Sequence, residues 1–482
     1  MPPSPYGGKT LRAMHFASNG SRLSITSVWK ALGALCVGLF ITLLDQSLVA
    51  VALPQITEDL DATVNQAVWV SAIYLLTFAV PLLVTGRLGD RFGQRNVYVV
   101  GMAIFTVAAA TCAFAPTIEL LIVARAVQGF GASLLNPQPL SVINRIFPVT
   151  KRGAAMGVWS AVASSSGLFG PVAGGLLVGG LGWRWVFLLY IPFGLIALVL
   201  VALWVPKLPT GVGRIDLFSA LLSLVAILGI VFTLQQGPEL GWPAWLIGVL
   251  AIGIGALVVF IWLQRRAQRL GLDALMPLEL FTIRNFRWGA VSVSTLGFAV
   301  YSVNLPIMLY LQLGAGISAQ SAGLLMLPMA AVSVSLAPLM GRLTDRLPPG
   351  RISKIGFSSM ITSMALFAVL ITFEVAVGWL VLPLVFQGAA NALSWSANSA
   401  ISMRQLPGHL VGAGSGVYNT SRQVGAVIGA AAVGAMMQIN LQFTGFSAAM
   451  GLSLVLHVVV LTIGFFAVSR FRSDLPPSSQ TT

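Results

Sequence analysis

Residues 246–263 have the sequence LIGVLAIGIGALVVFIWL, which is eighteen residues without a charge. An apolar run of this length predicts a helix that crosses a bilayer. Backbone polar groups in hydrocarbon need internal partners, which leaves helices or closed barrels. Barrel strands would be about 10 residues long and would alternate in polarity. The run therefore predicts a membrane-spanning helix.

The rest of the chain has the same character. Of its 482 residues, 57% are hydrophobic and 8% are charged, whereas soluble proteins carry about 25% charged residues. We therefore expect an all-α polytopic membrane protein with fourteen transmembrane helices. Their approximate spans are 30–51, 66–86, 97–115, 120–146, 154–180, 184–205, 215–235, 244–263, 287–311, 318–340, 352–373, 377–402, 412–437 and 446–468.

Basic residues decide the expected orientation. The formal net charge is +14, but nucleic-acid binding is not needed to explain it, because basic residues collect on the cytoplasmic side of membranes. With the N-terminus in the cytoplasm, 24 of the 27 lysines and arginines fall in inner loops and tails. We expect a multi-pass protein of the cell membrane with both tails, 1–29 and 471–482, in the cytoplasm. The first tail does not have the pattern of a signal peptide.

The chain also repeats itself. The motif Gly86-Arg87-Leu88 recurs 255 residues later at Gly341–Leu343, and Gln128-Gly129 recurs 259 residues later at Gln387-Gly388. Nearly equal offsets predict two homologous six-helix bundles, 30–205 and 287–470. Residues 206–286 would then hold two inserted helices and a basic cytoplasmic linker. Two repeated membrane halves are a common architecture of secondary transporters, with the substrate site between them. A channel or a receptor would not need this repeat.

A carboxylate lies within the first predicted helix. Asp45 occurs in LDQSLVAVALP, and a membrane-buried acid is a functional candidate by default. Removal from water disfavours its charged form, which suits a group that binds and releases a proton. The alternative is a structural carboxylate that is held by hydroxyls or by an arginine.

Arg125 offers a partner for this acid. It lies in RAVQGFG, and at 1.5 Å per residue the two side chains lie at similar depths, about 13 Å and about 9 Å below the outer surface. Proton binding at Asp45 would then release Arg125. The alternative is an arginine that bonds backbone carbonyls. We predict that Asp45 and Arg125 carry proton coupling.

Two glycine-rich motifs predict further contacts. The loop GRLGDRFGQR, Gly86–Arg95, allows a sharp turn between two helices, and its charges can form a latch across the cytoplasmic face. A plain basic turn is the alternative. The stretch GLFGPVAGG predicts close helix packing and a bend. The predicted latch residues are Gly86, Asp90, Arg91, Gly93, Arg95, Asp345 and Arg346, and those of the packing motif are Gly167, Gly170, Pro171, Gly174 and Gly175.

Taken together, these motifs resemble the fourteen-helix drug:proton antiporters of the major facilitator superfamily. The resemblance covers roughly residues 30–470 and includes WRWVFLLYIPFG at 183–194. It implies the major facilitator fold, export of small amphipathic compounds driven by proton entry, and a role for Asp45 and Arg125 in coupling. In that family the glycine-proline motif marks antiporters rather than uptake carriers.

The expected substrates are neutral, monocationic or anionic amphiphiles, because residues 287–470 offer only Glu374 as a further membrane acid. Several polar or aromatic side chains could line the substrate cavity, and helix-to-helix hydrogen bonding is their alternative role. An uptake carrier and a non-transporting sensor or scaffold stay open as other functions. We expect no enzymatic activity, cofactor, metal or nucleic-acid partner, and no accessory protein is indicated. The cavity candidates are Gln46, Tyr301, Asn304, Tyr310, Asn391, Trp395, Asn398 and Arg422.

Overall fold

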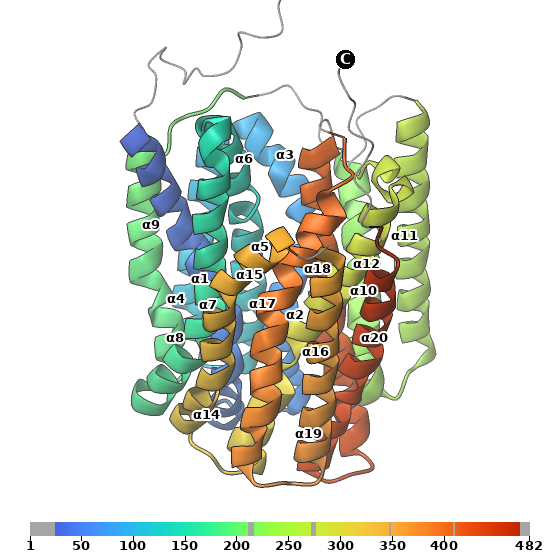
Figure 1. Cartoon of the computed structure of the whole chain (residues 1–482). Coiled ribbons are helices and arrows are strands. Elements are labelled where there is room, and N and C mark those ends of the chain that lie inside the picture. The colour runs from blue at the N-terminus through green and yellow to red at the C-terminus, as the bar shows by residue number, and fades with distance from the viewer. Residues whose placement is uncertain (1–24, 211–215, 271–275, 347–348, 408–409, 473–482) are drawn as a thin grey trace, which may run out of the picture.

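The computed structural model describes residues 25–210, 216–270, 276–346, 349–407 and 410–472, which form a bundle of helices without strands (Figure 1). The all-α membrane fold is therefore confirmed. The helices are α1 (Ile25–Asp59), α2 (Val64–Ala79), α3 (Leu82–Phe92), α4 (Gln94–Ala113), α5 (Ile118–Leu135), α6 (Gln138–Ile146), α7 (Val149–Leu181), α8 (Arg184–Leu188), α9 (Tyr190–Trp204), α10 (Leu217–Leu240), α11 (Ala244–Arg269), η1 (Leu278–Thr282), α12 (Arg284–Ser302), α13 (Asn304–Leu309), η2 (Tyr310–Gly314), α14 (Ala319–Leu325), α15 (Leu327–Arg346), α16 (Pro349–Thr372), η3 (Val377–Leu380), α17 (Val381–Met403), α18 (Val411–Leu441), α19 (Phe446–Ser453) and α20 (Val455–Ser469).

The number of spans is consistent with the sequence analysis. Twelve helical segments of the described chain are long and apolar enough to cross a membrane, and α2 with α3 make a thirteenth if the bent pair is one span. The remaining predicted span, 154–180, falls on α7, a helix of 33 residues. The total of fourteen stays a prediction.

Local sequence explains where several helices begin and bend. Thr63 and Gln66 form a capping box that starts α2, in which each side chain bonds the other residue's backbone N–H. Pro81 follows α2, and the chain bends by 51° between α2 and α3. Gly93 joins α3 to α4 at φ +88°, a backbone conformation that side chains with a Cβ rarely adopt.

Both ends of the described chain lie at one end of the bundle, which we call the near end (Figure 1). There Asn285, at the start of α12, donates a hydrogen bond to the carbonyl of Arg472 over 2.9 Å. The opposite end, which we call the far end, carries the turn between α1 and α2. The helices of residues 25–204 pack mainly on one another, as α1 does on α7 and α9, and α12 packs in the same way on α17, α18 and α20.

Helix α10 belongs to the predicted insertion 206–286 and contacts both groups of helices. It packs on α2, α18 and the outermost helix α11. Gly229 of α10 and Gly253 of α11 make this last contact close, because a Cβ at Gly229 would lie 2.9 Å from the Cα of Gly253. The predicted insertion thus forms a helical hairpin on one flank of the bundle.

A polar cluster joins α10 to its neighbours at the far end. The Asn65 side chain, 6% exposed on α2, accepts hydrogen bonds from Gln235 of α10 over 2.9 Å and from Gln438 of α18 over 2.8 Å. It also donates to Gln236 and Glu239 of α10. One asparagine therefore connects three separate parts of the chain.

Candidate functional site

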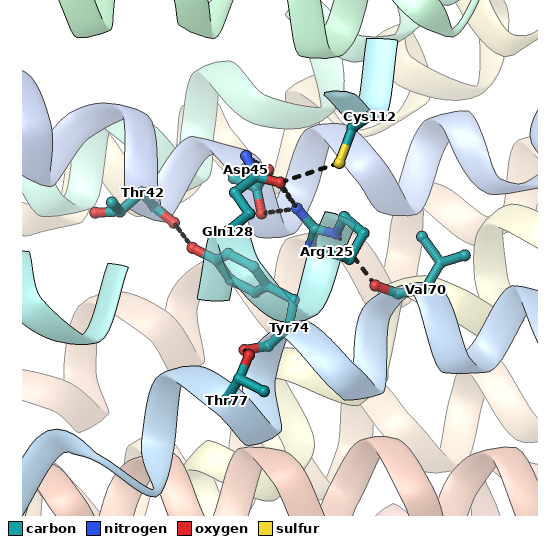
Figure 2. A network of polar contacts seen from close by, with 8 residues as sticks. All are labelled: Thr42, Asp45, Val70, Tyr74, Thr77, Cys112, Arg125 and Gln128. Carbon is teal, nitrogen blue, oxygen red and sulfur yellow. Dashed lines mark hydrogen bonds and ion pairs between the residues drawn. The ribbon is translucent and has the colours of Figure 1, made fainter. Parts of the chain in front are cut away.

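Asp45 of α1 and Arg125 of α5 form an ion pair in the interior of the bundle (Figure 2). The arginine Nη1 lies 2.8 Å from each carboxylate oxygen. The exposed fractions of the side chains are 0% for the acid and 1% for the arginine. An unpaired charge at such a place costs several kcal/mol, so the two side chains are stable there as one neutral unit.

Three further contacts hold the guanidinium. Its Nε donates to the carbonyl of Val70 over 3.1 Å, and its Nη1 donates to Gln128 Oε1 over 2.8 Å (Figure 2). Its central carbon lies 4.1 Å from the ring centroid of Tyr74, within the range of a cation–π contact. Arg125 is thus anchored to α2 and to its own helix without the carboxylate.

A glycine next to Gln128 allows this geometry. A Cβ at Gly129 would lie 2.4 Å from the carbonyl oxygen of Tyr74, so α5 approaches α2 at a distance that only glycine permits. The Tyr74 hydroxyl in turn donates to the carbonyl of Thr42 on α1 over 3.3 Å (Figure 2). The three helices around the ion pair are therefore fixed relative to one another.

The ion pair borders a cavity between the two groups of helices. Arg125 is one of the residues that line it. Residues of α1, α2 and α5 line one side, and residues of α12, α13 and α18 line the other. The lining consists of Gln46, Val49, Ala50, Val68, Ser71, Tyr74, Leu75, Arg125, Tyr301, Ser302, Leu305 and Ala430.

At the near end, the motif GRLGDRFGQR is not a loop but the end of α3 and the start of α4, joined by Gly93. It makes a contact that the sequence analysis did not include. Asp90 accepts a hydrogen bond from Arg145 of α6 over 2.9 Å and from Gln94 over 3.0 Å. Arg95 donates to the carbonyl of Ala202, and Arg91 lies over its neighbour Phe92. These hydrogen bonds of Asp90 and Arg95 lie within residues 25–204.

The other predicted latch positions add little to this arrangement. Gly86 packs near Pro137, whose Cβ would lie 3.7 Å from a Cβ at the glycine. The side chains of Asp345 and Arg346, in the second copy of the motif, lie outside the described residues. A latch between the two halves therefore stays a prediction.

The glycine-proline motif of α7 meets two neighbours. A Cβ at Gly170 would lie 2.3 Å from the Cβ of Ser47 on α1, and Gly174 packs on Val51 and Leu48 of the same helix. At the next residue, a Cβ at Gly175 would lie 2.7 Å from the carbonyl oxygen of Ala319 at the start of α14.

The proline of the motif lies at the same contact. The carbonyl of Pro171 lies against Gly323 of α14. The motif thus brings α7 into close contact with both halves, whereas the environment of Gly167 lies outside the described residues.

The fold and the motifs agree with comparisons to known proteins. The sequence profile of the Major Facilitator Superfamily matches residues 35–430. The chain belongs to this superfamily. It is 42% identical over 409 residues to an uncharacterized MFS-type transporter of Mycobacterium tuberculosis, covering 85% of this chain and 70% of the relative. It is 31% identical over 414 residues to the tetracenomycin C resistance and export protein of Streptomyces glaucescens, covering 85% and 76%.

Solved structures share the fold of this major facilitator. A crystal structure of a D-xylose-proton symporter superposes with a TM-score of 0.68 at 13% sequence identity, covering 93% of this chain and all of the other. At this identity the likeness concerns the fold. Membership in the superfamily makes the chain a multi-pass membrane transporter rather than an enzyme.

The structure gives the predicted cavity residues of this transporter different environments. Gln46 and Tyr301 line the cavity. Asn398 is fully buried and bonds Ser292 over 2.8 Å and Tyr418 over 2.9 Å, which connects α17 to α12 and α18. The lining of this cavity does not include Asn304, Tyr310, Asn391, Trp395 or Arg422, and their role stays a prediction.

Several residues of the site escaped the sequence analysis as functional candidates. The sequence analysis gives Gln128 only as part of a repeat and does not single out Tyr74, although each contacts Arg125. The Gln128 contact follows from spacing, because Gln128 lies three residues after Arg125 on one helix face. No group of three or more potential metal ligands occurs within the described chain, and both cysteines are free and buried.

Proposed function

We propose that this transporter exports small amphipathic compounds in exchange for protons by alternating access. The observation that carries the proposal is the buried Asp45–Arg125 pair on the wall of the cavity between the halves. A proton on Asp45 removes the countercharge of Arg125. The guanidinium then carries an uncompensated charge beside the cavity, which favours rearrangement of the helices around it.

Charge and a relative support the direction of transport. The basic residues of the described chain collect at the near end, which we assign to the cytoplasm of the cell. A membrane potential of about 100 mV, negative inside, then contributes roughly 2.3 kcal/mol for each proton that enters. One relative is named as a resistance and export protein for tetracenomycin C, which supports export of a drug-like compound.

Reconstituted protein tests this proposal. We would place the full chain in proteoliposomes that contain a pH-sensitive dye, impose a pH gradient and add a chemically diverse panel of amphiphiles that includes tetracenomycin C. The expected result is proton movement that depends on substrate, and substrate movement against the direction of proton flow. Asp45→Asn should abolish both movements while the protein stays folded.

A matched control makes the result specific. Asp59→Asn makes the same chemical change at the far end, where Asp59 is 41% exposed and pairs with Arg184 over 3.7 Å. This variant should keep coupled transport. Coupled export that survives in Asp45→Asn contradicts the proposal, substrate movement along with protons indicates a symporter, and the absence of any counterflow across the panel favours a sensor.

A further inference from the structure

Gln46 is an unusual member of the cavity wall. It follows Asp45 on α1, and successive helical residues point about 100° apart. Asp45 therefore faces α5 while Gln46 faces the cavity. Both polar atoms of its amide, Oε1 and Nε2, are buried and have no hydrogen-bond partner in the protein. Buried amides are almost always hydrogen-bonded, so this exception requires an explanation.

Three other polar side chains of the wall already have partners inside the protein. Arg125 is bonded to Asp45 and to the carbonyl of Val70. Tyr74 donates its hydroxyl proton to Thr42. Ser302 donates to the carbonyl of Phe298 and bonds the His457 ring. Unlike these groups, the Gln46 amide is available to a ligand as a donor and as an acceptor.

The charge of the wall narrows the class of ligand. Arg125 is the one charged residue among the residues that line the cavity, and it is paired with Asp45. The wall therefore offers no unpaired acid to a cation. Much of the remaining lining is aliphatic, including Val49 and Leu305, which suits an apolar body.

We propose that Gln46 selects uncharged amphiphiles that carry a hydrogen-bond donor and an acceptor side by side, as in a carboxamide. The ligand N–H donates to Oε1 of Gln46, and the ligand carbonyl accepts from Nε2. This inference rests on the proposed export function and names the substrate chemistry of the same cavity.

A matched pair of small ligands tests the proposal. Naphthalene-2-carboxamide has the donor and the acceptor, and methyl naphthalene-2-carboxylate has a similar body but no donor. We would measure binding of each by calorimetry to the full chain in nanodiscs, without a pH gradient. The wild type should bind the carboxamide about tenfold more tightly than the ester. Gln46→Met, which keeps the length of the side chain, should abolish this preference.

The chain offers a close control. Gln423 of α18 is 1% exposed, and both atoms of its amide also lack partners, but it does not line the cavity. Gln423→Met should therefore keep the preference. The proposal is overturned if the wild type binds the carboxamide no better than the ester, or not at all. It is also overturned if Gln46→Met keeps the preference or if Gln423→Met loses it equally.

A second variant covers the case in which Gln46→Met does not fold. Gln46→Glu places an acid in the wall and should increase binding of 2-naphthylmethylammonium at least tenfold, whereas Gln423→Glu should not. An unchanged affinity in Gln46→Glu overturns the proposal. The two proposals fail separately, because the binding comparison is made without a pH gradient. Absence of coupled transport overturns the export function, and absence of the carboxamide preference overturns the role of Gln46.

Discussion

The buried ion pair makes a quantitative prediction about stability. Asp45→Asn would leave the positive charge of Arg125 in the interior with the carbonyl of Val70, the amide of Gln128 and the ring of Tyr74 as its remaining partners. Breaking one side of a buried pair costs about 3–5 kcal/mol. Because those contacts stay, we expect the lower end, a loss of about 3 kcal/mol of unfolding free energy.

The reverse variant should cost less. In Arg125→Met the acid can take up a proton and lose its charge, so the loss is mainly that of hydrogen bonds, about 2 kcal/mol. The double variant has no charge left to bury, and we expect it to lose about 2–3 kcal/mol as well. The sum of the two single losses of unfolding free energy then exceeds the loss in the double variant by about 2 kcal/mol, which is the coupling energy of the pair.

Reversible unfolding in mixed detergent micelles, followed by far-UV circular dichroism, measures this cycle. The exposed pair of Asp90 and Arg145, whose side chains are 48% and 38% exposed, is the control, and its coupling should stay under about 1 kcal/mol. A coupling energy below about 0.5 kcal/mol for Asp45 and Arg125 would refute the reasoning, because independent sites add within that range.

Three further predictions concern how the helices move. Gly175→Val should separate α7 from α14 and lower the initial export rate, because a Cβ there meets the carbonyl oxygen of Ala319 at 2.7 Å. The control Gly180→Val should keep the export rate, since a Cβ there has no neighbour within 4 Å. Asn65→Leu should open the far end, which spin-label distances between α2 and α18 would report as a wider distribution; an unchanged distribution contradicts this. Reversing the charges of Asp90 and Arg145 together should restore an export rate that each single reversal lowers, and failure to restore it means that their contact is not needed.

The sequence predicted the helices and the ion pair for physical reasons. A long apolar run in a bilayer forms a helix. The spacing of residues along a helix gives the depth of each side chain in the membrane, which is why Asp45 and Arg125 were predicted to lie at similar depths and to pair. Partners across loops are harder to predict. The charges of GRLGDRFGQR predict a latch across the cytoplasmic face, and that prediction does not include the bond from Arg145 of α6 to Asp90.

Polar residues inside helices were the other difficulty. Gln46 and Asn398 look alike in sequence, but one faces the cavity and the other is bonded on both sides by Ser292 and Tyr418. Which face of a helix meets a cavity depends on how two distant segments pack, and the sequence of one helix does not contain this information.

The position of α10 has a consequence for lipid. The two halves meet along two seams that face the bilayer, one where α2 meets α18 and one where α7 meets α14. The hairpin of α10 and α11 shields the first seam, while α7 and α14 lie on the opposite flank (Figure 1). A lipid-soluble molecule in the leaflet therefore meets two different flanks: the hairpin covers one seam, and the direct contact of α7 with α14 closes the other.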